Sequence, residues 1–275
     1  MRFSLCNEVL RPLPFAAQCE VAAAMGYDGL EVAPFTLSDA PQSIPAAKRR
    51  ALRRQAGDAG LAITGLHWLL VAPEGLSIVS ADADIRRRTA AVIAALCELC
   101  ADLGSRYLVH GSPAQRALPE GEQAEAAKRA EDMLAQAAQA AERVGVIYCL
   151  EPLHRGETNF VNTIAEAAAI VQRIDNPHFR TMLDCSAAGL SETASVPELL
   201  DTWLPGGLLA HVQVNDPNRQ GPGQGEMRFA PILAALKAHG YAGDIGVEPF
   251  IYTPDGPASA ARAIGYLRGI WESLP

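Results

Sequence analysis

The chain has 275 residues, a formal net charge of -8, 49% hydrophobic residues and 20% charged residues. It is therefore long enough to bury a substantial core in one large domain. The acidic balance argues against nucleic-acid binding, which requires a clustered basic face, and the one basic cluster, at 48–50 with Arg53 and Arg54, is interpreted as a solvated helix surface.

No run of about 18 uncharged apolar residues is present, which argues against a membrane span. The opening segment MRFSLCNEVLRP is broken too early by polar residues and proline to act as a signal peptide, so we expect a cytoplasmic protein with no membrane contact. Most of the six cysteines lie in apolar segments, and the CxxC formed by Cys97 and Cys100 has no second pair or histidine near it. Buried, reduced thiols are expected.

Short β-like runs alternate with longer helix-like stretches along the whole chain. The predicted strands are 2–7, 29–34, 62–69, 106–112, 146–152, 180–186, 208–216 and 244–250. The predicted helices are 14–25, 45–59, 84–103, 121–143, 163–174, 229–239 and 257–272. Eight strands with intervening helices in about 250 residues predict an α/β fold, a (β/α)8 TIM barrel that forms a single domain over residues 1–275. A doubly wound open sheet usually has fewer strands.

In such a barrel the chemistry belongs to the carboxyl ends of the strands, because the loops that follow them open onto one face. The last polar residues of the predicted strands are Asn7, Glu31, His67, His110, Glu151, Asp184, Gln213 and Glu248. Of these, Asn7, Glu31 and His110 have the weakest claim to a functional role.

The polar residues of the last four strands are the most informative. They are Glu151, Asp184, Gln213 and Glu248, and each follows apolar residues. A buried, unpaired carboxylate costs several kcal/mol, about 2–7 for a polar group without a hydrogen bond and more for a charge, so it needs compensation. An arginine partner is one solution, but Arg180 is the only arginine or lysine in those strands. A shared metal ion explains all four together.

Strand 208–216 contains HVQVN, in which His211, Gln213 and Asn215 share one face because side chains alternate along a strand. Gln213 is nearer the rim and is the better ligand, whereas His211 is expected to be a packed, hydrogen-bonded supporting group. Asn215 is expected to shape the loop. Three carboxylates and an amide oxygen form an all-oxygen site, which favours one Mn²⁺ or Mg²⁺ ion over zinc.

At these residues the chain resembles the sugar isomerase and epimerase superfamily of xylose isomerase-like barrels, which includes ketose 3-epimerases and hydroxypyruvate isomerases. The resemblance covers nearly the whole chain. Its motifs are LEPLHRGETNFVNT at 150–163, LeuAsp at 183–184, HxQ at 211–213, Arg219 in NDPNR, GPGQGE at 221–226 and GluPro at 248–249. Their order and spacing carry the resemblance.

The resemblance implies an enzyme in which Glu151, Asp184, Gln213 and Glu248 bind one divalent metal. Glu151 and Glu248 would also be the catalytic pair that moves protons, and Glu157 and Arg219 would contact the substrate. In the implied reaction one glutamate removes a proton beside a metal-bound carbonyl, and the metal stabilises the resulting cis-enediolate. Return of the proton to the opposite face gives an epimer, and return to the neighbouring carbon gives an isomer.

The chain departs from the family pattern in two places. Ketose epimerases usually have histidine at the position of Gln213, and hydroxypyruvate isomerase-like members have glutamine. The histidine that usually follows the ligand aspartate by three residues is replaced by Ala187. His67 or His154 are candidates to supply the missing substrate contact. The substrate is therefore left at a small keto sugar or polyhydroxy keto acid.

Three other functions are alternatives to an epimerase or isomerase. Lyases and dehydratases of the same superfamily begin with the same proton abstraction, and a non-catalytic subunit would lack metal binding. A DNA-repair endonuclease of related fold would need a histidine-rich zinc site and a basic face, which six histidines and a net negative charge do not favour. The oligomeric state stays open; relatives are often dimers or tetramers, which allows a homo-oligomer by analogy.

Overall fold

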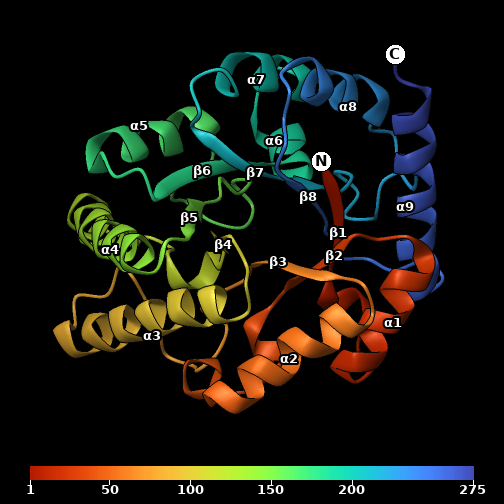
Figure 1. Cartoon of the computed structure of the whole chain (residues 1–275). Helices are drawn as coiled ribbons and strands as arrows, with labels where there is room; N and C mark the ends of the chain where they lie inside the picture. Colours follow the sequence, from red (N-terminus) through yellow and green to blue (C-terminus); the bar gives the residue numbers. More distant parts are fainter.

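The computed structural model describes residues 1–275 and contains a closed barrel of eight parallel strands in sequence order, with the first strand paired to the last (Figure 1). The strands are β1 (Arg2–Cys6), β2 (Gly29–Val32), β3 (Ala62–Leu66), β4 (Tyr107–His110), β5 (Ile147–Leu150), β6 (Phe179–Asp184), β7 (Leu209–Val214) and β8 (Asp244–Val247). The predicted fold is confirmed, and each predicted strand is found, all eight ending earlier than predicted.

A ring of helices surrounds the strands, and α9 closes it beside α1 (Figure 1). The helices are α1 (Phe15–Met25), α2 (Ala46–Asp58), α3 (Ala83–Asp102), α4 (Gln123–Val144), α5 (Ile164–Ile174), α6 (Cys185–Ser191), α7 (Val196–Trp203), α8 (Phe229–Ala238) and α9 (Gly256–Ser273). Short 3-10 helices also follow strands, among them η1 (Asn7–Leu10) and η4 (Pro113–Gln115).

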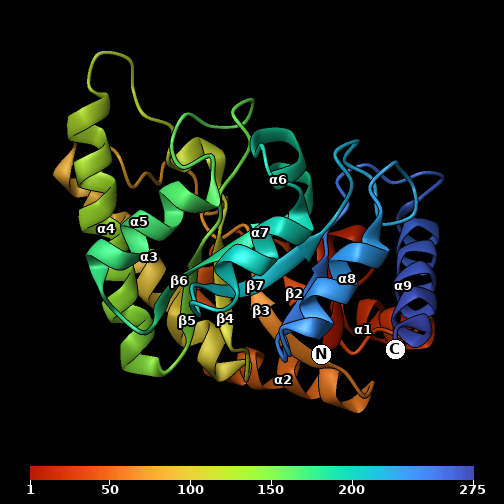
Figure 2. The same ribbon diagram turned by 90° about the horizontal axis from the view of Figure 1, so that it is seen from above.

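The sequence did not predict α6 and α7, which connect β6 to β7. Both are short, and α6 has the sequence CSAAGLS, which carries no apolar periodicity. The helix starts because the Asp184 side chain accepts a hydrogen bond from the Ala187 N–H and so caps its first turn. Figure 2 shows α6 standing on the same side of the barrel as the loops that follow the strands.

Apolar side chains pack in two places. A cluster of 66 buried residues joins the strands to the helices, and a cluster of four, Tyr107, Val109, Cys149 and Met182, is separate from it. All six cysteines are buried and free, as expected. None of the helices combines the length and the apolar composition that crossing a membrane would require.

A glycine in β3 makes room for the aromatic ring that supports the polar interior of the barrel. Gly65 pairs with Tyr107 of β4, and a Cβ atom at Gly65 would lie 2.2 Å from that ring. The Tyr107 hydroxyl donates a hydrogen bond of 2.8 Å to Glu31, and its ring stacks on His211 with centroids 4.1 Å apart. The absence of a side chain at Gly65 therefore leaves room for the Tyr107 ring, which in turn contacts Glu31 of β2 and His211 of β7.

We predict that Gly65→Ala lowers the free energy of unfolding by about 1–3 kcal/mol, because the added methyl group overpacks the barrel against Tyr107. Chemical denaturation measures the change. Gly57→Ala in α2 is the control, since a Cβ there meets nothing within 4 Å, and it is expected to stabilise by up to about 1 kcal/mol. Equal stability of Gly65→Ala and the unmodified protein would contradict this account of the barrel interior.

Candidate active site

Three of the predicted acidic residues meet at the carboxyl ends of the strands. Glu151 directly follows β5, Asp184 ends β6 and Glu248 follows β8. Each is buried, with 5 to 6% of its surface exposed, and one carboxylate oxygen from each lies within 4.8 Å of the others. We call these three residues the acidic cluster. Because the three come from well-separated parts of the sequence, their convergence is a product of barrel closure.

Asp184 is held by hydrogen bonds to both of its oxygens. One oxygen accepts from the Ala187 N–H at 2.7 Å, and the other accepts from the Asn215 amide at 2.8 Å. The same Asn215 amide group donates to the main-chain oxygen of Glu248 at 3.1 Å, and its own oxygen accepts from the Ser186 N–H. Asn215 therefore fixes two members of the acidic cluster relative to each other, a larger role than the loop-shaping one that the sequence suggested.

A buried arginine lies beside Glu151. Arg116, which follows η4, is fully buried and donates a hydrogen bond of 2.6 Å to the main-chain oxygen of Glu151. Sequence analysis found only Arg180 near these carboxylates, because Arg116 comes from a loop rather than from a strand. Arg116 bonds to main-chain oxygens, including that of His110, and no ion pair joins it to a carboxylate. The acidic cluster thus keeps a surplus of negative charge.

Gln213 lies next to Asp184 in the strand pairing of β6 and β7 and is fully buried. Its amide nitrogen donates to Glu31 at 2.8 Å, which leaves its side-chain oxygen buried without a hydrogen-bond partner. His211, also fully buried, has its Nε2 atom 2.9 Å from the second oxygen of Glu31. Glu31 therefore orients Gln213 so that its amide oxygen stays free, as a metal ligand requires.

Burial and mutual repulsion raise the pKa values of the acidic cluster. Desolvation raises the pKa of Glu151 well above its ordinary value, and the charge of Asp184 adds to this effect. Desolvation likewise raises the pKa of Glu248, helped by the charges of Glu151 and Asp184. For Asp184, desolvation outweighs the hydrogen bonds from Ala187 and Asn215 and raises the pKa to about 6. A divalent cation among these oxygens would favour the charged forms.

A cleft with an accessible volume of about 60 Å³ opens above the acidic cluster. The side chains of Trp68, His154, Glu157, Arg219 and Phe250 line it together with the acidic cluster. The ring of Trp68 lies 6.0 Å from that of Phe250, and the Arg219 guanidinium lies over the Phe250 ring at 4.9 Å. The cleft therefore has apolar walls, an acidic floor and one exposed cation at its mouth, an arrangement suited to a small polar ligand.

Two histidines named as candidate substrate contacts lie in different places. His154 lines the cleft, and its Nε2 atom lies 3.5 Å from Glu157. His67 is outside the cleft lining, 1% exposed, with its Nε2 atom 3.0 Å from Glu8 and 3.7 Å from Glu248. Ala187 lies in the wall of the cleft. Of the two, only His154 has access to a bound ligand.

The remaining strand-end residues have structural partners. Asn7 donates hydrogen bonds to Gln18 and Thr36 and accepts one from the Ala33 N–H. His110 is fully buried, with its Nδ1 atom 2.7 Å from the Tyr148 hydroxyl. Neither lines the cleft. Sequence analysis missed Glu8, a buried acid in η1, because it lies two residues beyond the end of β1.

Comparison with protein families places this architecture. The family model described as xylose isomerase-like TIM barrel matches residues 19–270. The chain belongs to this family. Its sequence is 32% identical to a D-psicose 3-epimerase of Ruminiclostridium cellulolyticum over 45% of the chain and 41% of that relative. It is 30% identical to an L-ribulose 3-epimerase of Mesorhizobium japonicum over 72% of the chain and 65% of that relative. The matched region thus spans less than two thirds of either relative.

A solved structure extends the likeness of fold to the full length of the chain. The D-psicose 3-epimerase of Clostridium cellulolyticum H10, solved with D-tagatose, superposes with a TM-score of 0.84 and covers 98% of this chain and 99% of its own. The sequence identity is 22%. At this identity the superposition shows a shared fold, and the function has to be argued from the cleft itself.

The acidic cluster predicts how stability depends on pH in chelated protein. Carboxyl groups with raised pKa values bind more protons in the folded state than in the unfolded state, so stability decreases as pH rises from the ordinary carboxyl range through about 6, the pKa of Asp184. Glu151→Gln removes one of the repelling charges and is expected to weaken this decrease. Thermal unfolding between about pH 5 and about pH 8 measures it.

Glu120→Gln is the matched control, because Glu120 is an exposed residue remote from the cleft lining. Its pH profile should follow that of the unmodified chelated protein. A Glu151→Gln profile that does the same would show that the acidic cluster carries no repulsive strain.

Proposed function

We propose that this protein is a divalent-metal-dependent epimerase or isomerase of a small keto sugar or polyhydroxy keto acid. The observation that carries the proposal is the acidic cluster, three buried carboxylates with oxygens within 4.8 Å of one another on the floor of an open cleft. The epimerase names of the relatives support it. The shared fold allows it without deciding the substrate.

The donor set fits a hard divalent ion. The carboxylates of Glu151, Asp184 and Glu248, together with the partnerless amide oxygen of Gln213, would hold Mn²⁺ or Mg²⁺, both of which prefer oxygen ligands. When bound, the ion would polarise a substrate carbonyl and make the neighbouring C–H more acidic. It would also offset the charge that the acidic cluster concentrates in a buried place.

Proton transfer falls to Glu151 and Glu248. They reach the floor of the cleft from β5 and β8, so a substrate carbon between them would meet one carboxylate on each side. One glutamate takes the proton from carbon. The other returns a proton to the opposite face to give an epimer, or a proton returns to the neighbouring carbon to give an isomer.

Substrate hydroxyl and carbonyl groups would be bound by Glu157 and Arg219, with His154 as a further donor. All three line the cleft, and Trp68 and Phe250 would cover the apolar face of the sugar. Four carboxylates and a single exposed arginine line the space.

A lyase or dehydratase is the second candidate, because it would begin with the same proton abstraction. The observation that favours it is Ala187, which replaces the histidine found at this place in epimerases of the family. Product analysis decides between the two, since an epimerase or isomerase conserves the mass of its substrate and a lyase does not.

We predict that Glu151→Gln and Glu248→Gln each slow the exchange of a substrate C–H with D₂O by about 10²–10⁴-fold, because each removes a group that moves the proton. Proton NMR with a panel of ketoses, ketose phosphates and keto acids measures the exchange in Mn²⁺-loaded protein. Glu120→Gln is the control and should exchange at the unmodified rate. Undiminished exchange in both cleft variants would overturn the assigned roles.

We also predict that Mn²⁺ or Mg²⁺ raises the melting temperature of chelated protein. An ion at a hundredfold excess over its Kd stabilises the folded state by about 2.7 kcal/mol if it does not bind the unfolded chain. Asn215→Ala should reduce the ion affinity by about 10–100-fold, because it releases Asp184 from its hydrogen bond. Differential scanning calorimetry tests both statements, and an ion titration without any shift in melting would count against the site.

A further inference from the structure

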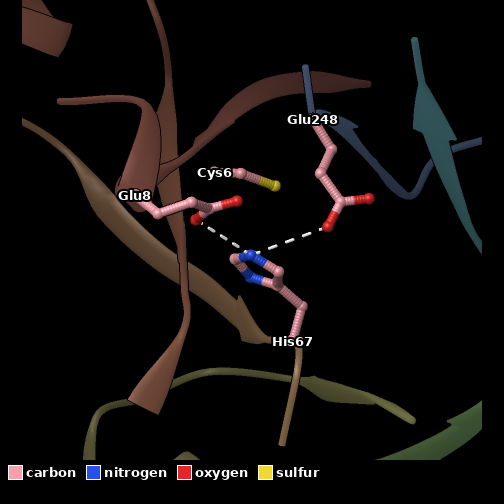
Figure 3. A group of neighbouring side chains, drawn as sticks. All are labelled: Cys6, Glu8, His67 and Glu248. Atoms are coloured by element: carbon pink, nitrogen blue, oxygen red, sulfur yellow. Dashed lines mark hydrogen bonds and ion pairs between the residues drawn. The ribbon is translucent and has the colours of Figure 1, made fainter. Parts of the chain in front are cut away.

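A second group of potential metal ligands lies beside the acidic cluster. Figure 3 shows its members, Cys6 at the end of β1, Glu8 in η1, His67 directly after β3 and Glu248 after β8. Each of the four is buried, and one ligand atom from each lies within 4.8 Å of the others. Only Glu248 also lines the cleft. We call these four residues the mixed cluster.

Atoms that could bind a metal ion line the centre of the mixed cluster, and they have too few hydrogen-bond partners. The Nε2 atom of His67 lies 3.0 Å from one oxygen of Glu8 and 3.7 Å from an oxygen of Glu248. The other oxygen of Glu8 is buried and has no partner, and Figure 3 shows it on the side of Cys6 and Glu248. Glu8 is only 7% exposed, so water does not compensate the loss.

Charge near the mixed cluster is also unbalanced. Glu31, the other acid within 4 Å of His67, already has His211 at 2.9 Å and the hydroxyl of Tyr107 at 2.8 Å. Glu8 and Glu248 therefore share His67 as their only nearby cationic side chain. The fourth member, Cys6, is a thiol and adds no positive charge. Two buried carboxylates with one histidine between them leave an excess of negative charge, which a bound cation would neutralise.

We propose that Cys6, Glu8, His67 and Glu248 form a second cation site, selective for zinc or a similar divalent ion. One sulfur, one imidazole nitrogen and two carboxylate oxygens make a four-ligand set of the kind that zinc accepts, whereas magnesium and manganese prefer oxygen alone. Zinc–ligand bonds of about 2.0–2.3 Å in a tetrahedron place ligand atoms about 3.3–3.7 Å apart. In the present structure the four ligand atoms lie within 4.8 Å of one another, and the Nε2 atom of His67 lies 3.0 Å from Glu8 and 3.7 Å from Glu248.

The two sites would differ in metal and share one carboxylate. Glu248 belongs to both the acidic cluster and the mixed cluster, so it would be a ligand of both ions. A zinc ion would fix its orientation from the side away from the cleft. The inference goes beyond the proposed function, because Cys6, Glu8 and His67 have no part in the proton transfer assigned to the cleft.

Cobalt spectroscopy tests the proposal, since Co²⁺ takes zinc sites and gives a thiolate-to-cobalt absorption band in the near ultraviolet only when a cysteine binds it. Full-length protein loaded with Mg²⁺ is titrated with Co²⁺. We expect the thiolate band to appear and to saturate at one ion per chain. Cys6→Ala should abolish it, and Cys19→Ala, which removes an equally buried thiol in α1, should leave it unchanged.

Further variants separate this site from the acidic cluster. Glu8→Gln keeps the shape of the side chain but removes its charge, and it should lower the Co²⁺ affinity by about tenfold or more. Asp184→Asn alters only the acidic cluster and should keep the thiolate band even if the protein proves inactive on every ketose. The band therefore reports on the mixed cluster whatever the fate of the proposed function.

Two results would overturn the proposal. One is a Co²⁺ titration of correctly folded protein without a thiolate band. The other is an equal zinc content, measured by mass spectrometry after Mg²⁺ loading and zinc dialysis, in Glu8→Gln and unmodified protein. The second measurement does not depend on Cys6→Ala, so it holds even if that variant fails to fold.

Discussion

The buried negative charge at the carboxyl ends of the strands is the constraint around which the rest of this barrel is arranged. Glu151, Asp184 and Glu248 bring their oxygens within 4.8 Å of one another, and each is nearly inaccessible to water. Hydrogen bonds from Asn215 and the Ala187 N–H satisfy Asp184 but do not cancel its charge. A protein that concentrates like charges in this way gives up stability unless a ligand supplies the opposite charge.

A different buried acid, Glu31, has its charge compensated by three groups, one from β4 and two from β7. Tyr107 and Gln213 donate hydrogen bonds to it, and His211 lies 2.9 Å from it. Although burial opposes this, the nearby His211, the charge of His67 and the hydrogen bond from Tyr107 lower the pKa of Glu31 to about 2. The contrast with the raised pKa of Glu151 is physical. One carboxylate is surrounded by donors and an imidazole, and the other faces further carboxylates.

The barrel could be predicted from the sequence because the periodicity of each strand and helix is a local property. Barrel closure then brings these elements together without changing them. It predicted the convergence of Glu151, Asp184 and Glu248 because all three lie at strand ends, where the geometry of a TIM barrel fixes their direction. The same reasoning missed α6, whose short sequence has no apolar periodicity, and α7, an amphipathic helix of 8 residues that begins with a capping box formed by Ser195 and Glu198. The start of α6 is set by a local cap, the Asp184 side chain, which accepts a hydrogen bond from the Ala187 N–H and gives no periodic signal.

The contacts that sequence analysis missed come from outside the strands. Arg116 reaches the main chain of Glu151 from the loop after β4, and Glu8 reaches His67 from η1. Loop residues carry no periodic signal that would give their direction, so a strand-based reading names the carboxylates and not their neighbours. His67 is the opposite case, a strand-end residue that the sequence suggested as a substrate contact. It is absent from the cleft lining, and its Nε2 atom lies 3.7 Å from Glu248.

The main chain of Ala187, and not its side chain, makes the contact with Asp184. The position of the carboxylate is therefore independent of which side chain stands at residue 187. The N–H of Ala187 holds the carboxylate, while its side chain faces the cleft. Exchange of that side chain therefore alters the volume and polarity offered to a ligand without disturbing the acid beside it. A single substitution at residue 187 can thus change which ligands the cleft prefers while the acidic cluster keeps its arrangement.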